Sequence, residues 1–389
     1  GWFTGDRFGF IRSCWLINDG DSACQIELLD GVQNLLPYGA SASLQSSLSS
    51  LVNAYKRNEL DPKTGLAIYA LSATLSDRAE PSESLKATVA WQVGLRGGDH
   101  LLCSDQIDAF RACQPVQSEQ DVLGKAGAYM VNASFELASG QSQHWRIVAD
   151  VNQDSAAVVR LRKQLQLGQE AIIKALDEDV AQGTVKLAQY VAAADGLQAT
   201  SQEMTTTHHF ANVLFNVMRG GIFAKGYQVE RDDLLDFVGV RNRPLLARQA
   251  DWFALLPGRL SIQDLHARAA DTNDPDLIRL CYEYLPLSFS RRHGDPSRPW
   301  NAFSINLKRP DGSPRLDYQG NWRDIFQNWE PLAHSFPNYV ESMVAKFLNA
   351  TTVDGYNPYR VTRDGIEWEV PEPANPWSNI GYWSDHQII

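Results

Sequence analysis

Residues 128–151 read AYMVNASFELASGQSQHWRIVADV, and apolar and polar side chains alternate along most of this stretch. Alternation with a period of two is typical of a half-buried β-strand, because successive side chains point to opposite faces of a sheet. The ASGQ segment, residues 138–141, interrupts the alternation with glycine and small polar residues that favour a turn. The pattern therefore predicts two strands separated by a turn, as in an antiparallel sheet.

The same signals extend towards the N-terminus. Residues 84–95, SLKATVAWQVGL, alternate in the same way and run into the glycine-rich turn RGGD at residues 96–99. One stretch differs: in residues 41–60 the leucines and Val52 recur at steps of three and four, which predicts a helical insert. We expect an antiparallel β-sandwich domain over residues 1–155.

The composition changes after residue 155. Residues 156–197 are rich in alanine, leucine, glutamine and lysine, contain no proline and have a helical apolar period, which predicts a helical linker over residues 156–204. Helical segments separated by long polar loops then fill residues 205–389; they are predicted at 205–221, 233–241, 243–256, 261–270, 275–285, 323–336, 338–351 and 384–389. Because helices that arrive in pairs suit a layered toroid, the predicted fold is α+β and multidomain: a β-sandwich, a helical linker and part of an (α/α)6 toroid.

Bulk properties exclude several classes of function. A chain of 389 residues exceeds the usual size of a single core. The net charge of −11 and the lack of any block of lysine or arginine argue against a nucleic-acid partner. No apolar run approaches the roughly 20 residues that span a bilayer, so no membrane partner is expected. Five cysteines without a CxxC pair predict reduced thiols and a cytoplasmic location.

No cofactor or metal site is expected. Adjacent His208 and His209 cannot lie on one face of a helix, so they do not suit a shared metal ion. No glycine-rich nucleotide motif and no nucleophile motif is present.

The richest functional signal is GNWRDIFQNWEPLA, residues 320–333, where aromatic and hydrogen-bonding side chains gather at the start of a predicted helix. Steps of three and four place Asp324, Gln327 and Asn328 on one helix face. An alternative stands beside a binding role: Asp324 is an acid favoured by the helix dipole, and Arg323 is its surface partner.

Two later loops have the same character. The segment DGYNPYR, residues 354–360, is a credible turn, yet turn chemistry does not explain Tyr359 and Arg360. The segment GYWSDHQ adds Trp383 and Asp385 at the start of another predicted helix. Sugar rings present CH faces that stack on aromatic planes and hydroxyls that need directional partners, so such loops suit a carbohydrate pocket. For any one of the aromatic residues, burial in the core is the competing interpretation.

With these loops in view, the chain resembles the family of inverting glycoside phosphorylases that includes cellobiose and chitobiose phosphorylase. Proteins of that family carry an arginine–aspartate pair followed by glutamine and a second acid, similar to Arg323, Asp324 and Gln327 here, with Asn328 in place of the second acid. A "DG" with a tyrosine-rich segment and then an acidic turn with a tryptophan follow in the family, as VDGYNPYR and, loosely, YWSDHQI follow here.

The resemblance implies a function and a set of site residues. It implies an enzyme that cleaves oligosaccharide glycosidic bonds by inversion, either a glycoside phosphorylase with inorganic phosphate as co-substrate or a glycoside hydrolase, and a homodimer is usual in that family. The residues assigned to the oligosaccharide are Arg323 and Asp324 on the glycone sugar, Gln327, Tyr359 and Arg360 in support, and Trp383 and Asp385 as a second wall.

The catalytic residue is not assigned. In the resembled family the general acid lies in a tryptophan–asparagine–aspartate motif that would fall beyond Ile389, so we expect this chain to be an N-terminal fragment that is inactive by itself. The alternative is a non-catalytic sugar-binding or assembly protein with the same pocket, and a third is a helical scaffold whose aromatic residues are only core.

Overall fold

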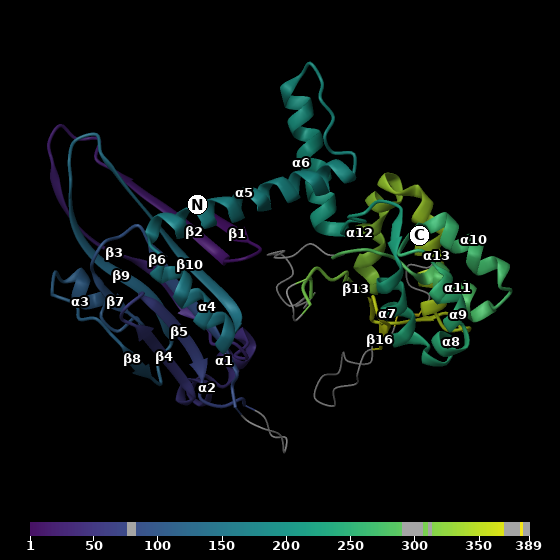
Figure 1. The fold of residues 1–389 in the computed structure, drawn as a ribbon, viewed down its shortest axis with the longest axis horizontal. Helices are drawn as coiled ribbons and strands as arrows, with labels where there is room; N and C mark the ends of the chain where they lie inside the picture. Colours follow the sequence, from purple (N-terminus) through teal and green to yellow (C-terminus); the bar gives the residue numbers. More distant parts are fainter. Residues whose placement is uncertain (76–82, 290–305, 310–312, 369–381, 384–389) are drawn as a thin grey trace. The chain divides into compact units, whose positions relative to one another are not determined.

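The structure is a computed structural model, and it describes residues 1–75, 83–289, 306–309, 313–368 and 382–383. The chain divides into two compact units, residues 1–185 and residues 186–389. Helix α5 (Gln169–Ala193) crosses the division, which falls inside the predicted linker. The described residues form a mixture of helices and antiparallel sheets (Figure 1).

The first unit contains two antiparallel sheets. Its strands are β1 (Trp2–Gly5), β2 (Gly9–Ile17), β3 (Cys24–Leu35), β4 (Lys56–Asp61), β5 (Leu66–Leu71), β6 (Lys86–Val93), β7 (Asp99–Leu101), β8 (Asp121–Leu123), β9 (Gly127–Leu137) and β10 (Ser142–Asp154). The larger sheet has the order β1-β2-β10-β6-β5-β4-β8 and the smaller one β3-β9-β7. The two strands predicted in residues 128–151 are β9 and β10, and they belong to different sheets.

Alternation along the strands of the larger sheet separates two cores. Tyr69 and Ile147 share a cluster with Tyr129 of β9, so both sheets contribute to this core. Trp91 and Val148 point to the opposite face and join a second cluster with residues of α4 (Ser155–Gln166) and α5. The larger sheet is therefore packed on both faces, which explains why its central strands are buried along most of their length.

The insert predicted as helical over residues 41–60 is only partly so. The helices α1 (Ala42–Ser47) and α2 (Ser49–Ala54) form as expected, but Lys56–Asp61 is strand β4. Pairing of this segment with β5 buries Lys56, Asn58 and Leu60 on alternate positions. Tertiary pairing overrides the local helical pattern here. One further short helix, α3 (Ile107–Arg111), was not predicted.

The linker and later helices follow the predictions, except that the helix predicted over residues 243–256 is divided in two at Gln249. The predicted linker contains α4 and α5. Asp154 is the N-cap of α4, and its carboxylate accepts a hydrogen bond of 2.7 Å from the Ala157 amide. The later helices are α6 (Glu203–Gly220), α7 (Arg231–Arg241), α8 (Arg243–Arg248), α9 (Ala250–Leu255), α10 (Ile262–Asp271), α11 (Pro275–Glu283), α12 (Trp322–Ser335), the 3₁₀ turn η1 (Pro337–Tyr339) and α13 (Val340–Ala350). The helix predicted at 384–389 lies outside the described residues.

No helix in the described ranges is long and apolar enough to cross a bilayer.

The second unit also contains short strands that the sequence analysis did not predict. They are β11 (Gln228–Glu230), β12 (Arg259–Ser261), β13 (Gln319–Asn321), β14 (Tyr356–Asn357), β15 (Arg360–Thr362), β16 (Ile366–Glu367) and β17 (Tyr382–Trp383). One apolar cluster joins residues of the helices with Tyr318 and Val361, which flank the short strands.

The cysteines agree with the prediction of reduced thiols. All five lie in the described part of the chain, and each is a free thiol. Burial raises the pKa of Cys103 to about 11 and that of Cys281 to about 12, so both are held as neutral thiols near neutral pH.

Candidate functional site

Helix α12 begins where strand β13 ends. Asn321 takes the extended backbone of an N-cap, with φ −63° and ψ 141°. Asp324 lies in the first turn, half-buried, where the positive end of the helix dipole favours a carboxylate. This position is compatible with both interpretations of Asp324, as a ligand of a sugar and as an acid that stabilises the helix terminus.

Strand pairing places the start of α12 beside the second predicted loop. Strand β13 runs antiparallel to β15 with Asn321 opposite Arg360. The Trp322 amide donates a hydrogen bond of 2.9 Å to the carbonyl oxygen of Tyr359. The first two loops, separated by more than one helix in sequence, therefore share one backbone ladder.

A second pair of strands connects the third loop. Strand β14 runs antiparallel to β17, with Tyr356 opposite Trp383. The backbone of all three predicted loops is therefore joined through two small sheets. Asp385, and the side chains of Arg323 and Trp383, lie outside what the structure describes.

Several aromatic residues of the first loop belong to the core. Trp322 and Trp329 are 1% and 2% exposed, and Tyr318 is fully buried. The Trp322 and Trp329 rings lie 5.5 Å and 5.2 Å from the ring of Phe347. For these residues the core interpretation is correct, because such packing leaves no face for a ligand.

The second loop carries aromatic groups of a different kind. The rings of Tyr356 and Trp368 stack at 5.9 Å, and Trp368 is 41% exposed. Beside them, the Arg360 guanidinium lies 5.8 Å from the Tyr359 ring and 3.3 Å from the Glu367 carboxylate. Trp368 was not among the predicted site residues; its signal was a tryptophan flanked by two glutamates, a context that disfavours burial.

The polar face of α12 is held by helix α6. The Arg219 guanidinium donates to the side-chain oxygen of Asn328 at 3.0 Å and to that of Gln327 at 3.3 Å. The helices approach so closely that a Cβ on Gly220 would lie 2.0 Å from the Asn328 carbonyl oxygen. Because arginine only donates, it orients the amide of exposed Gln327 with its oxygen towards α6.

A buried ion pair anchors the segment that follows Arg360. Arg363, only 4% exposed, lies 2.8 Å from the carboxylate of Asp233 on α7. The Tyr284 hydroxyl donates to the other carboxylate oxygen of Asp233 at 2.7 Å. Burial, and then the negative charge of Asp233, raise the pKa of Tyr284 well above its usual value, so it remains a donor.

More charges surround this ion pair. Glu283, 2% exposed, accepts from Arg241 at 3.1 Å and Arg279 at 2.9 Å. The Lys346 amine, in a residue 1% exposed, donates to the Arg363 carbonyl oxygen at 3.2 Å. Burial, and then the positive charge of Arg241, lower the pKa of Lys346 far below its usual value. These contacts fix the loop behind the predicted site from α7, α11 and α13.

The two adjacent histidines, His208 and His209, lie on helix α6. The His209 ring nitrogen Nε2 hydrogen-bonds to the backbone carbonyl of Asp195 at 2.8 Å. Within the described ranges no group of three histidine, cysteine, aspartate or glutamate side chains is arranged to hold a metal ion.

Part of the chain is similar to a known family of domains. Residues 223–286 match the model of glycoside hydrolase family 149 insertion domain 1. This match supports a link to a glycoside hydrolase family and does not single out the inverting phosphorylases that the sequence resembles. The search of curated proteins found no match.

The matched segment contributes directly to the buried charges around Arg363. It covers helices α7–α11 and supplies Asp233, Arg241, Glu283 and Tyr284. Asp233 and Arg241 contact Arg363, three residues beyond the predicted ligand Arg360. A segment with glycoside-hydrolase similarity therefore contacts Arg363, in the stretch that directly follows the second predicted loop.

Proposed function

We propose that this chain is part of a carbohydrate-active enzyme, a glycoside phosphorylase or glycoside hydrolase, and that its second unit binds the glycone end of an oligosaccharide. The observation that carries the proposal is the pairing of β13 with β15 and of β14 with β17, which joins the backbone of the three predicted loops. The similarity of residues 223–286 to a glycoside hydrolase family supports it.

The side chains at these loops suit a sugar. The Asp324 carboxylate accepts hydrogen bonds from sugar hydroxyls, and the Gln327 amide group, with its oxygen fixed by Arg219, donates one. The stacked and partly exposed Tyr356 and Trp368 offer an aromatic face to the CH face of a ring. We assign Arg323, Tyr359, Arg360, Trp383 and Asp385 to the same pocket.

In the proposed reaction a raised-pKa carboxylic acid protonates the glycosidic oxygen while the nucleophile attacks from the opposite face of the sugar. In a phosphorylase, inorganic phosphate is the nucleophile. In a hydrolase, a second carboxylate about 6.5–9.5 Å from the acid activates water. The residues named above hold the glycone, and none of them is assigned as the acid.

The proposal includes the fold. The two sheets of the first unit share a core, which supports a β-sandwich. The paired helices of the second unit support part of an (α/α)6 toroid.

Isothermal titration calorimetry of the full chain with gluco-oligosaccharides of two to six units tests the proposal. The key variant is Asp324→Asn, which keeps the size and removes the charge. A hydrogen bond to a charged group contributes about 1.5–3 kcal/mol, so binding should weaken roughly 10- to 100-fold.

A matched control separates binding from helix stability. Asp251 is an exposed acid in the first turn of α9, so Asp251→Asn loses the same dipole interaction without touching the loops. Equal affinity of Asp324→Asn and the parent chain would contradict the proposal and leave the acid with a helix-terminal role. Binding without turnover in the longest native form of the protein would favour a non-catalytic sugar-binding protein.

A further inference from the structure

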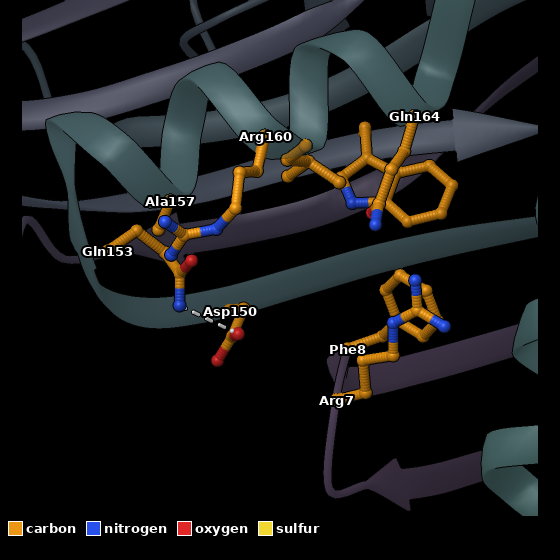
Figure 2. A pocket seen from close by; sticks show the side chains of 9 residues that line it. Arg7, Phe8, Asp150, Gln153, Ala157, Arg160 and Gln164 are labelled. Atoms are coloured by element: carbon orange, nitrogen blue, oxygen red, sulfur yellow. Dashed lines mark hydrogen bonds between the residues drawn. The ribbon is translucent and has the colours of Figure 1, made fainter. Parts of the chain in front are cut away.

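A small polar cavity lies in the first unit, which contains none of the predicted site residues. It has a volume of about 180 Å³ and lies between helix α4, the end of β10 and the turn that joins β1 to β2 (Figure 2). An engineered cavity of about 150 Å³ holds benzene, so this one accommodates a six-membered ring. Buried Phe8 and Trp91 line its inner side, and exposed Arg7 and Arg160 line its rim.

The turn that carries Arg7 is rigidly held. The Asp179 carboxylate accepts hydrogen bonds from the amides of Asp6, Arg7 and Phe8 at 3.1, 3.2 and 3.1 Å. A Cβ on Gly5 would lie 1.9 Å from that carboxylate, so a larger residue there would displace Asp179 from the turn. The Arg7 guanidinium lies 4.8 Å from the centre of the Phe8 ring, which orients it at the cavity.

Helix α4 forms the opposite wall. Ala157, Arg160 and Gln164 line the cavity from one helix face, and the small side chain of Ala157 leaves room below the helix. The Asp154 cap satisfies the Ala157 amide, so the helix terminus itself is not the binding group. In Figure 2, Arg160 reaches down from α4 towards Gln153, and Arg7 lies across the hollow.

The lining combines positive charge with groups for hydroxyls. Among the described residues, neither Arg7 nor Arg160 has a carboxylate partner within ion-pair distance. The Asp150 carboxylate accepts from its neighbouring amide at 2.8 Å and from Gln153 at 2.9 Å, which fixes it on one side of the cavity. Guanidinium groups suit a phosphate, whereas a carboxylate and the Gln164 amide suit hydroxyl groups.

From this geometry we propose that the cavity binds a sugar phosphate, with the phosphate between Arg7 and Arg160 and the sugar hydroxyls on Asp150 and Gln164. Neither a bare anion nor a neutral sugar uses the whole lining, because the first leaves the carboxylate and amides unused and the second leaves the two guanidinium groups unused. The site is independent of the proposed oligosaccharide site, which lies in the second unit.

Calorimetric titration of the full chain with glucose 1-phosphate tests the proposal. Arg7→Ala and Arg160→Ala should each weaken binding about tenfold or more, since each removes a charge-assisted hydrogen bond. Lys163→Ala removes the same charge from the same helix at an exposed position that does not line the cavity, so it should leave affinity unchanged. Glucose and inorganic phosphate should each bind at least about tenfold more weakly than glucose 1-phosphate.

A substitution in the second unit tests which unit binds glucose 1-phosphate. Asp324→Asn should not alter this affinity, although it should weaken oligosaccharide binding. Absence of saturable binding, equal binding of phosphate alone, or unchanged affinity in an Arg7→Ala/Arg160→Ala double variant would overturn the proposal. Loss of glucose 1-phosphate binding in Asp324→Asn alone would overturn it too, and would assign that ligand to the second unit.

Discussion

The two units of this chain differ in the length of their strands and in the amount of charge that they bury. In the first unit, long ladders build the sheets around largely apolar clusters; the β3–β9 ladder, for example, pairs residues from Cys24↔Leu137 to Leu35↔Gly127. In the second unit the strands are two or three residues long, and charges such as Arg363 and Glu283 are buried among the helices. The first unit is therefore built mainly from alternating apolar strands, whereas the second has shorter strands and depends more on buried ion pairs.

The largest expected effect tests that dependence. Arg363→Met leaves the Asp233 carboxylate buried without its ion partner, which should destabilise the second unit by about 3–5 kcal/mol. Hydrogen exchange should then rise in α7, α11 and α13 and remain unchanged in β9 and β10. The control is Arg309→Met, whose ion pair with Asp236 is exposed, with an expected cost below about 1 kcal/mol. Equal effects of the two substitutions would show that the second unit does not depend on its buried charges.

The counterpart in the first unit is an apolar deletion. Leu66 on β5 is fully buried, so Leu66→Ala should cost about 2–5 kcal/mol through lost burial and the cavity left behind. Hydrogen exchange should rise in the larger sheet and not in α7 or α13. Leu85→Ala, at a side chain that is 76% exposed, should have little effect. A small effect at Leu66 would mean that this sheet does not depend on tight apolar packing.

An acid titration examines an ion pair of the first unit in which the carboxylate is buried and the arginine is half exposed. Asp61 lies 2.6 Å from Arg162, and this contact is the principal cause that lowers its pKa to about 2. Because the folded pKa lies below the unfolded one, the ion pair stabilises the protein above about pH 4, and this stabilisation is lost as the pH falls towards about 2.

The matched variant is Asp61→Asn. It should be less stable than the parent by about 1.5–3 kcal/mol at about pH 6, and the difference should shrink steadily below about pH 4. Urea unfolding at several pH values measures this difference. Asp121→Asn, on the neighbouring strand β8, is an exposed control. A difference between Asp61→Asn and the parent that does not change with pH would contradict the assigned ion pair.

The smallest expected effect comes from an exposed pair in the same sheet. Arg57 contacts Glu59 and Asp121 at 3.0 and 3.2 Å, and all three side chains are more than 40% exposed. Arg57→Ala should leave stability almost unchanged, and any change should diminish at high salt because exposed charges are screened. A large and salt-independent loss of stability would show that charge matters as much in the first unit as in the second.

Sequence patterns predicted local structure well and its exceptions have physical causes. Residues 128–151 and 84–95 became strands, and α4, α5 and α6 formed where a helical period was present. The error at Lys56–Asp61 arose because pairing with β5 outweighs a helical spacing of leucines. The short strands of the second unit were missed because two or three residues are too few to show a period.

The candidate site was likewise predicted only in part. The sequence singled out the loops of Asp324 and Tyr359, and the structure joins their backbones. It did not indicate that Trp322 and Trp329 are buried while Trp368 is exposed, nor that Arg219 binds Gln327. Two residues that are in contact but lie about a hundred positions apart in the sequence leave no local pattern in either segment.

The sequence by itself determined the alternation of the first unit, most of the helices and the three polar aromatic loops, because each depends on neighbours within a few residues. Only the tertiary structure decided which sheet receives β9 and which receives β10, how β13–β15 and β14–β17 join the loops, and where Arg7 meets α4. Those outcomes depend on the balance of burial, pairing and desolvation among distant segments, and that balance exists only in the folded chain.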